Sequence, residues 1–385
     1  MRFDFKDDYT VYRLNEICKR VTRKNKNIES TLPLTISAQY GLVDQITFFN
    51  KSVASSNLEG YYLLKNGEFA YNKSYSKDYP WGAIKRLDKY EQGCLSTLYI
   101  CFDINKTCNS DYLVHYFESP KWYKQVSDIA GEGARNHGLL NISVDDFFQT
   151  KHRFPSLDEQ VKVSKLLNLI ETRIQTQNKI IKKYESLIKS IEEKIIWKGN
   201  DSSYVPIKDF LIEKNEKSTI QDQYPVLSST VKGLFLQSDY FQREVASSNN
   251  IGYKITKLND IIISPQNLWM GNITYNDKFE NGIVSPSYHI YEIRDGYNKQ
   301  YIATILKSYK ALYRYKSISE QGASVVRRNL NMDAFLDITF PIPSKRKQDE
   351  AGMIIQQLHL KLDVENHYLD SLFSQKTYFL NNMFI

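Results

Sequence analysis

The amino-acid sequence contains two diverged copies of one unit, and this repeat constrains the fold more than any other feature. The string Val-Ala-Ser-Ser-Asn that begins at Val53 recurs 192 positions later, beginning at Val245. Further matches follow in the same order, at an offset that settles at 188: Pro33 with Pro225, Ser37 with Ser229, Phe49 with Phe241, Asp88–Gly93 with Asp277–Gly282, Asn141 with Asn329, and Pro155-Ser156 with Pro343-Ser344. One short string can recur by chance, whereas a collinear series predicts a tandem repeat.

The last part of each copy has the periodicity of a coiled coil. Apolar residues alternate at spacings of four and three from Val163 to Ile195, and a mostly apolar series runs at the shifted positions from Ala351 to Met383. This heptad pattern predicts two long helices, over 156–199 and 344–385. The segments 1–155 and 200–343 are then two globular domains.

The two predicted helices differ where they begin and share one polar seam position. Ser156 and Glu159 have the spacing of a capping box, whereas Ser344 is followed by three cations, which predicts a weaker first turn. Gln177 interrupts the first apolar seam and Glu365 interrupts the second at the equivalent position. Such a pair either fixes the register of paired helices or lies at the edge of the seam.

The globular segments mix strand and helix signals. Short apolar and aromatic runs, such as 95–104, 261–263 and 287–293, predict strands with a few helices between them. Two heptad helices in one chain pair most economically with each other. The predicted fold is therefore α+β: two tandem α/β globules joined by two long helices that form an antiparallel coiled coil.

Composition argues against several classes of protein. No apolar run approaches the roughly 20 residues that cross a bilayer, and the N-terminal residues lack the apolar core of a secretory signal, so we expect a cytoplasmic protein. The four cysteines and six histidines lack metal-ligand spacing, so neither a disulfide framework nor a metal site is expected. The net charge of +7 fits a polyanionic partner and an ordinary basic protein equally well.

The sequence offers no catalytic constellation. It lacks a methyltransferase Asn/Asp-Pro-Pro-Tyr loop and a G-x-x-x-x-G-K-[ST] phosphate loop, and the glycines from Gly131 to Gly138 have the wrong spacing for a dinucleotide site. Asp88-Lys89 recurs as Asp277-Lys278 among glycines and aromatics, which is typical of a hairpin turn. We therefore expect no enzyme activity on this chain.

The order globule, long helix, globule, long helix resembles the specificity (S) subunit of Type I restriction–modification systems. The resemblance covers essentially the whole chain. It depends on Phe154-Pro-Ser-Leu-Asp-Glu-Gln160, on its partner Ile342-Pro-Ser-Lys-Arg-Lys-Gln348, and on the Gly-Ala pairs that begin at Gly133 and Gly322. The sequence departs from the family at Lys347, where glutamate is usual.

The resemblance implies a non-catalytic subunit that recognises DNA. Each globule would be a target recognition domain that reads half of a bipartite, asymmetric target, and the helices would set the spacer and dock the methyltransferase subunits, two in number. S-adenosylmethionine, ATP and Mg²⁺ would belong to the methyltransferase and restriction/translocase subunits, with no cofactor on this chain. Two other readings stay open at this point: a coiled-coil scaffold whose globules bind proteins, and an enzyme with an unrecognised site.

Candidate contacts with double-stranded DNA come from residue types that hydrogen-bond base edges or phosphates. Two loops at equivalent places in the copies differ in chemistry, as two readers of different sequences should. The spacing of the basic run that begins at Lys19 predicts one basic helical face. The candidate residues are Lys73, Tyr75 and Lys77 in the first loop, Gln266, Asn267 and Trp269 in the second, Arg135, Arg327 and Arg328 before the helices, and Arg20, Arg23 and Lys24 in the basic run.

Three apolar residues of the first predicted helix lie outside its heptad seam. Leu166, Leu169 and Ile180 need burial by something other than the partner helix. We expect them to bind the modification subunit, unless the globules cover them. The repeated Val-Ala-Ser-Ser-Asn strings are predicted to be structural, since readers of different sequences share a scaffold and not their base contacts.

Overall fold

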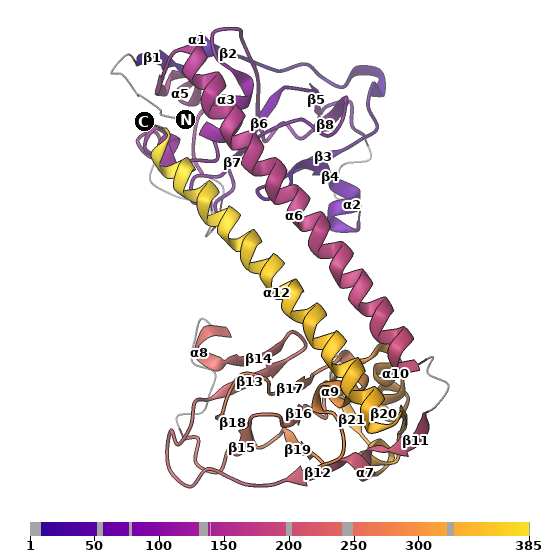
Figure 1. The fold of residues 1–385 in the computed structure, drawn as a ribbon. Coiled ribbons are helices and arrows are strands. Elements are labelled where there is room, and N and C mark those ends of the chain that lie inside the picture. Colours follow the sequence, from indigo (N-terminus) through magenta and orange to yellow (C-terminus); the bar gives the residue numbers. More distant parts are fainter. Residues whose placement is uncertain are drawn as a thin grey trace. The chain divides into compact units, whose positions relative to one another are not determined.

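The computed structural model describes residues 9–51, 57–76, 79–130, 138, 140–197, 202–240, 249–321 and 327–384. The chain forms two compact units (Figure 1). Unit 1 comprises residues 1–178 and 368–385, and unit 2 comprises residues 179–367. Each unit therefore contains one globule, the first part of the helix that follows it, and the last part of the other long helix.

The elements of the first globule are β1 (Thr10–Arg13), α1 (Leu14–Ile17), β2 (Cys18–Arg20), η1 (Lys26–Ile28), β3 (Leu34–Ser37), β4 (Gly41–Asp44), α2 (Gln45–Phe49), β5 (Tyr62–Lys65), β6 (Phe69–Asn72), β7 (Ala83–Arg86), β8 (Gln92–Leu95), β9 (Ile100–Ile104), α3 (Ser110–Tyr116), η2 (Pro120–Trp122), α4 (Tyr123–Ser127), α5 (Val144–Gln149) and β10 (Lys151–Phe154). The long helix α6 (Leu157–Trp197) follows.

The elements of the second globule are β11 (Ser203–Pro206), α7 (Ile207–Phe210), β12 (Leu211–Lys214), β13 (Leu227–Thr230), β14 (Gly233–Leu236), α8 (Gln237–Tyr240), β15 (Lys254–Lys257), β16 (Ile261–Ile263), η3 (Leu268–Met270), β17 (Ile273–Tyr275), β18 (Asn281–Val284), β19 (His289–Ile293), α9 (Lys299–Lys307), α10 (Tyr309–Ser317), β20 (Ser319–Gln321), β21 (Arg328–Leu330), α11 (Met332–Leu336) and β22 (Thr339–Ile342). The second long helix is α12 (Lys345–Asn382). No helix among the described residues is both long and apolar enough to cross a bilayer.

The two globules share the topology of one four-stranded sheet and three strand pairs, which confirms the predicted tandem α+β fold. The antiparallel sheet β2-β9-β6-β7 of the first matches β12-β19-β16-β17 of the second. The pairs β1-β10, β3-β4 and β5-β8 likewise match β11-β22, β13-β14 and β15-β18. The predicted strand 261–263 is β16, the predicted run 95–104 contains β9 and the last residue of β8, and the run 287–293 contains β19.

A repeated glycine is explained by close packing. A Cβ on Gly93 would lie 2.4 Å from Leu34 Cδ1, and one on Gly282 would lie 2.2 Å from Leu227 Cδ1. Only glycine fits at either position without displacing the leucine. The preceding Asp88 and Asp277 connect strands of different sheets, so the predicted hairpin turn at Asp88-Lys89 and Asp277-Lys278 is wrong.

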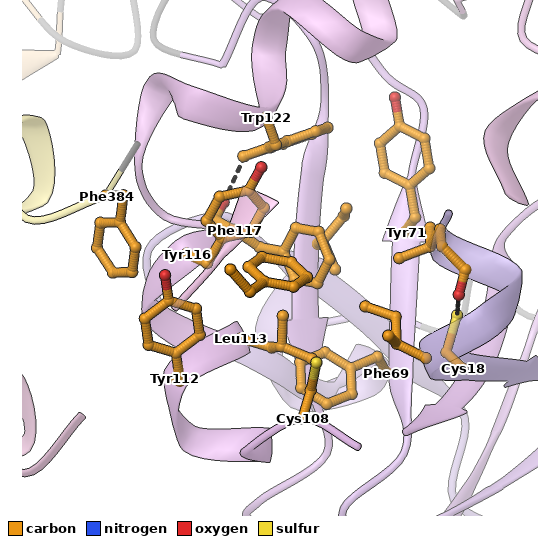
Figure 2. Packing of buried hydrophobic residues seen from close by; sticks show 14 of the residues in the cluster. Cys18, Phe69, Tyr71, Cys108, Tyr112, Leu113, Tyr116, Phe117, Trp122 and Phe384 are labelled. Carbon is orange, nitrogen blue, oxygen red and sulfur yellow. Dashed lines mark hydrogen bonds between the residues drawn. The ribbon is translucent and has the colours of Figure 1, made fainter. Parts of the chain in front are cut away.

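Aromatic side chains dominate the core of unit 1 (Figure 2). Phe69 and Tyr71 of β6 contribute from the sheet, and Trp122 donates its indole N–H to Phe117 O at 2.9 Å. Phe384 belongs to the same core, with its ring centroid 5.2 Å from that of Tyr112. The end of α12 is thus anchored in unit 1 by burial of apolar surface.

Within each unit the two long helices run antiparallel, as the heptads predict. In unit 1 the seam residues of α6 pack in one core with residues from the end of α12, and in unit 2 the start of α12 packs with the end of α6. The residues concerned are Val163, Leu167, Ile170, Ile174, Leu369, Leu372 and Phe379 in unit 1, and Ile195, Ile196, Trp197 and Ala351 in unit 2.

One glutamine joins each globule to the helix that follows it. The Gln160 side chain accepts a hydrogen bond from Asn109 N at 2.8 Å and donates one to Pro155 O at 2.9 Å. Gln348 does the same with Asn298 N and Pro343 O, both at 2.9 Å. This glutamine clasp gives a physical reason for the glutamine six positions after the repeated Phe/Ile-Pro-Ser start.

The helix starts differ from the predicted caps. Ser156 Oγ accepts from Glu159 N at 3.4 Å, but the Glu159 carboxylate pairs with Lys162 Nζ at 2.5 Å, so the predicted reciprocal box is replaced by an ion pair. At the second start, Lys345 pairs with Asp349 and Arg346 pairs with Glu350. These acids, one turn along, offset the cations that were expected to weaken the first turn.

Candidate nucleic-acid interface

In unit 2 the two predicted contact segments lie together. Arg328 N donates to Gln266 O at 3.0 Å, which joins β21 to the loop after β16. The Arg328 guanidinium lies 4.9 Å from the centre of the Trp269 ring, and Lys316 Nζ lies 5.8 Å from it. We call Gln266, Trp269, Lys316 and Arg328 the Trp269 cluster. It joins an aromatic face, an amide and two cations at one place.

The local backbone explains how Trp269 is positioned. The buried strand β16 ends at Ile263, and the chain turns there because Asn267 N donates to Ser264 O at 3.1 Å. Leu268 is fully buried and anchors the short helix η3, whose C-cap Gly271 lies in the left-handed region with φ 96°. The anchored leucine fixes the adjacent Trp269, so its ring is held by the scaffold.

Two buried polar atoms at this place have no hydrogen-bond partner within the described structure. They are Asn267 Oδ1, an acceptor, and Arg328 Nε, a donor. Arg328 Nη1 is already bound to Ser319 O at 3.2 Å, which orients the guanidinium. Unsatisfied buried polar atoms are costly, so a bound ligand or water that reaches them is stabilised. Gln266 and Arg327 are exposed beside them.

In unit 1 the first predicted loop has the equivalent location, after β6. Tyr75 N donates to Gly138 O at 2.7 Å, and Leu140 N donates to Lys73 O at 2.9 Å, so this loop also pairs with the segment that precedes the next helix. The Lys73 ammonium is bound to Ile142 O at 3.0 Å, whereas the Tyr75 side chain is 58% exposed. Tyr75 is therefore the accessible aromatic group of this loop.

Several predicted residues lie outside the described residues. These are Lys77, Arg135, the Gly-Ala pairs at Gly133 and Gly322, and most of both Val-Ala-Ser-Ser-Asn strings. The asparagines that end the strings are described. Asn57 Oδ1 accepts from Glu59 N at 2.9 Å, and Asn249 Oδ1 accepts from Ile251 N at 3.0 Å. Both hold the same local turn.

The predicted basic helical face is wrong. Arg20 is in strand β2, which pairs with β9, and the chain continues without a helix through Arg23 and Lys24. Arg23 Nη2 donates to both carboxylate oxygens of Glu68, at 2.7 and 2.8 Å. Lys24 Nζ donates to Gly60 O at 2.8 Å and lies over the Tyr62 ring. Arg23 and Lys24 tie the globule together, and Arg20 remains exposed.

The three apolar positions of α6 divide according to exposure. Leu169 is 62% exposed and Ile180 is half-buried, whereas Leu166 packs against the core of unit 1. Leu166 is thus partly covered within unit 1, whose core combines residues of the globule and of both long helices. Sequence reasoning missed a larger exposed apolar set on the long helices: Leu187, Met353, Ile354, Leu360, Val364, Tyr368, Phe373 and Tyr378. Their positions outside the heptad seam are the signal that could have found them.

The described residues contain no group of three or more His, Cys, Asp or Glu that could hold a metal ion. Their four cysteines are buried free thiols, and burial raises the pKa of Cys94 and Cys108 to about 11. These thiols are therefore protonated and poorly nucleophilic at neutral pH.

Comparison with known proteins places this architecture. No protein-family model matches the sequence, and no curated protein matches it either. The Type I restriction–modification S subunit from M. genitalium is similar, with a TM-score of 0.57 and 15% identity over 100% of this chain and 98% of that chain. A chain from a structure that addresses complex assembly and conformational transition of the type I R-M system gives a TM-score of 0.58, with 13% identity over 98% of both chains.

The chain is thus a tandem-repeat protein in which two like globules are each joined to paired antiparallel helices. Its fold is that of the Type I restriction–modification S subunit, as the sequence resemblance implied.

Proposed function

We propose that this chain is the non-catalytic DNA sequence-recognition subunit of a Type I restriction–modification complex in the cytoplasm. The observation that carries the proposal is the match of the whole chain, both globules and both helices, to solved S subunits. Methyl transfer from S-adenosylmethionine and ATP- and Mg²⁺-dependent cleavage would then belong to methyltransferase and restriction subunits bound to it.

Each globule would read one half of a bipartite, asymmetric target. The loops after β6 and β16 have equivalent places but present Tyr75 in one unit and the Trp269 cluster in the other. Arginine recognises guanine through two hydrogen bonds, and glutamine recognises adenine in the same way. An aromatic ring next to the arginine stacks against its guanidinium group. A shared scaffold with unlike loops is what two readers of different half-sites require.

The paired helices would set the spacer between half-sites and bind two methyltransferase subunits. Their exposed apolar residues support this, because such residues gain free energy when a partner buries them. A protein-binding scaffold would also present an apolar surface, so DNA binding has to be measured directly.

The test is to express the chain with the methyltransferase encoded beside it and to map methylated sites across the host genome. We expect one bipartite methylated motif, and we expect affinity of the purified complex for a duplex with that motif to fall steeply with salt. A complex that binds duplex DNA without salt dependence, or a chain that never co-purifies with a methyltransferase, would favour the scaffold.

A further inference from the structure

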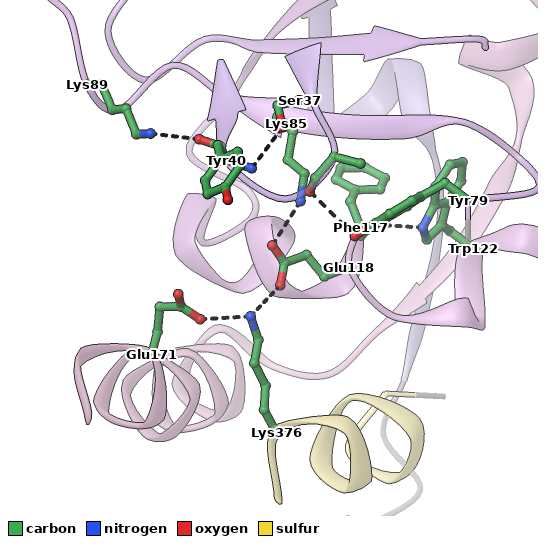
Figure 3. A network of polar contacts seen from close by, with 11 residues as sticks. Ser37, Tyr40, Tyr79, Lys85, Lys89, Phe117, Glu118, Trp122, Glu171 and Lys376 are labelled. Atoms are coloured by element: carbon green, nitrogen blue, oxygen red, sulfur yellow. Dashed lines mark hydrogen bonds and ion pairs between the residues drawn. The ribbon is translucent and has the colours of Figure 1, made fainter. Parts of the chain in front are cut away.

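An ion-pair cluster joins α12 to unit 1 (Figure 3). Lys376 Nζ lies 2.9 Å from Glu118 Oε2 and 2.7 Å from Glu171 Oε2, and Lys85 Nζ pairs with the other oxygen of Glu118 at 3.0 Å. The side chains of Lys376 and Glu118 are mostly buried. Burial alone would raise the pKa of Glu118, but Lys85 and Lys376 lower it to about 2. Glu118 is therefore charged, and the lysine from α12 forms ion pairs with both Glu118 and Glu171.

The same place in unit 2 has charges of the opposite sign. Aligning the N-cap residues Asn109 and Asn298 makes Lys307 the equivalent of Glu118, and His359 of α12 is the equivalent of Glu171 on α6. Here the other helix is α6, and its Glu192 Oε1 lies 2.8 Å from His359 Nε2. The hydrogen bond that His359 donates to the Glu192 carboxylate raises the pKa of His359.

These unit 2 residues line one pocket of about 290 Å³. Lys232 and Lys278 also line it, while Asp277 on the pocket wall and Asp363 on α12 offset part of the positive charge. Without the glutamate from α6 this place is predominantly basic. Without Lys376, the corresponding place in unit 1 is acidic, because Glu118 and Glu171 outnumber Lys85.

We propose that these two clusters of opposite sign determine which helix end docks on which unit, so that α6 pairs with α12 and not with a second copy of itself. The tandem repeat creates the need for such a device. The apolar seams of α6 and α12 are equivalent, so burial alone would also allow the end of α6 from one molecule to dock on unit 1 of another. A chain can discriminate between such partners through contacts that favour the right one and through repulsion against the wrong one.

Both wrong pairings bring like charges together. The end of α6 on unit 1 would bring Glu192 to Glu118 and Glu171. The end of α12 on the unit 2 of another copy would bring Lys376 to Lys307, and His359 would lose the carboxylate of Glu192. The native pairing satisfies both clusters, and buried polar contacts that fix register and partner are well attested in coiled coils. This inference does not depend on DNA recognition.

The test reverses both docking charges in the full-length chain, as the double variant Glu192→Lys with Lys376→Glu. In this variant the end of α6 carries the charge that suits unit 1, and the end of α12 carries the charge that suits unit 2. The end of α6 from one molecule should then dock on unit 1 of a second molecule, and the end of α12 on its unit 2. The two molecules would pair α6 with α6 and α12 with α12 in a closed dimer. We expect the fraction of chain that co-purifies with a differently tagged second copy to rise at least about tenfold, with a doubled mass in sedimentation velocity.

Two controls distinguish a change of pairing partner from a general weakening of the contacts between the helix ends and the units. The neutral pair Glu192→Gln with Lys376→Met should lower the unfolding temperature without enriching the dimer, and Lys183→Glu, a reversal at an exposed lysine of α6, should change neither readout. A reversed chain that keeps the wild-type mass, or a neutral variant that dimerises equally, would overturn the inference. If the double reversal does not fold, each single reversal must exceed the neutral variant in co-purification, and failure there also overturns it. No DNA or methyltransferase enters these measurements.

Discussion

Trp269 shows how a single side chain organises its surroundings. Its ring lies under Arg328 and near Lys316, while the buried Leu268 beside it holds the backbone. Because one Arg328 nitrogen is bound to Ser319 O, the guanidinium plane is fixed before any ligand arrives. Such preorganisation reduces the entropy lost on binding, so residues of this cluster should affect affinity more than exposed cations elsewhere.

Removing Arg328 should weaken DNA binding by the assembled complex. For Arg328→Ala we expect a loss of about 1–3 kcal/mol, or roughly 5- to 150-fold in affinity, with relaxed methylation specificity in one half-site. Competition binding at fixed salt and genome-wide methylation mapping measure the two effects. Arg294→Ala is the matched control. This exposed arginine follows β19, at the end of the four-stranded sheet opposite to the loop after β16. Equal losses in both variants would remove Arg328 from the interface.

Buried His152 should make unit 1 sensitive to mild acid. Burial lowers its pKa from 6.5 to about 4, and its two ring nitrogens bond to Tyr116 and Thr150 at 2.9 and 2.8 Å. The unfolded chain therefore takes up the proton first as pH falls. The contribution of neutral His152 to the free energy of unfolding is fully present above pH 6.5. The free energy of unfolding should decrease by up to ~3 kcal/mol between pH 6.5 and 4.

Urea unfolding at several pH values measures this loss. His152→Gln should be less stable at pH 7 and have a flatter pH dependence. Some slope should remain, since burial also lowers the pKa of His115. An unchanged slope in the variant would show that His152 does not carry the effect.

At the scale of elements, local periodicity was predictable and distant pairing was not. The heptads of α6 and α12 and the strand at Ile261–Ile263 follow from apolar spacing alone. By contrast, the basic run around Arg20 has spacing that fits a helix, but Arg20 lies in β2, whose partner β9 is some 80 positions away in the sequence. Long-range pairing overrides local preference there.

The candidate site shows the same division. Residue types identified Gln266, Trp269 and Arg328 separately, and only the fold brings them into one cluster. No local pattern distinguishes Arg23, bound to Glu68, from Arg20, which is exposed.

The exposed Leu169 and the half-buried Ile180 of α6 should bind a partner. Leu169→Glu with Ile180→Glu should abolish co-purification of the methyltransferase while leaving the unfolding temperature within a few degrees of wild type. Leu166→Glu should instead destabilise unit 1, because Leu166 packs on its core. Lys165→Glu changes charge at a neighbouring exposed position and serves as the control. Retention of the methyltransferase by the folded double variant would contradict this assignment.

Lengthening the helices should change the spacer of the recognised sequence. Seven residues added at the level of Gln177 and seven at Glu365 preserve the heptads and add ~10 Å, equivalent to about three base pairs. Those base pairs also rotate one half-site by roughly 100°. The variant should lose its original target, and any new target should keep both half-sites with a longer spacer.

Methylation mapping in cells that carry the lengthened protein checks this. An unchanged spacer would mean that the helices do not measure distance. Altered half-sites would mean that the helices take part in base recognition.

For the whole molecule, duplicate topology predicts separable readers. Exchanging residues 200–343 for the equivalent segment of a related subunit should alter one half of the methylated motif and leave the other intact. The same mapping method gives the answer. If both halves changed, the globules would not read independently.

The glutamine clasp has a consequence for how such proteins diversify. Gln160 and Gln348 make the same hydrogen bonds to the backbone N–H of an asparagine N-cap and to a proline carbonyl. The junction between globule and helix therefore has the same structure in both repeats. Recombination at this junction could move a globule from the first repeat to the second without a change in the junction residues. A lineage could then obtain new ordered pairs of half-sites by shuffling globules it already has. In a transferred globule, the residue equivalent to Glu118 or Lys307 would have to be replaced by one of opposite charge to match the helix end at its new position.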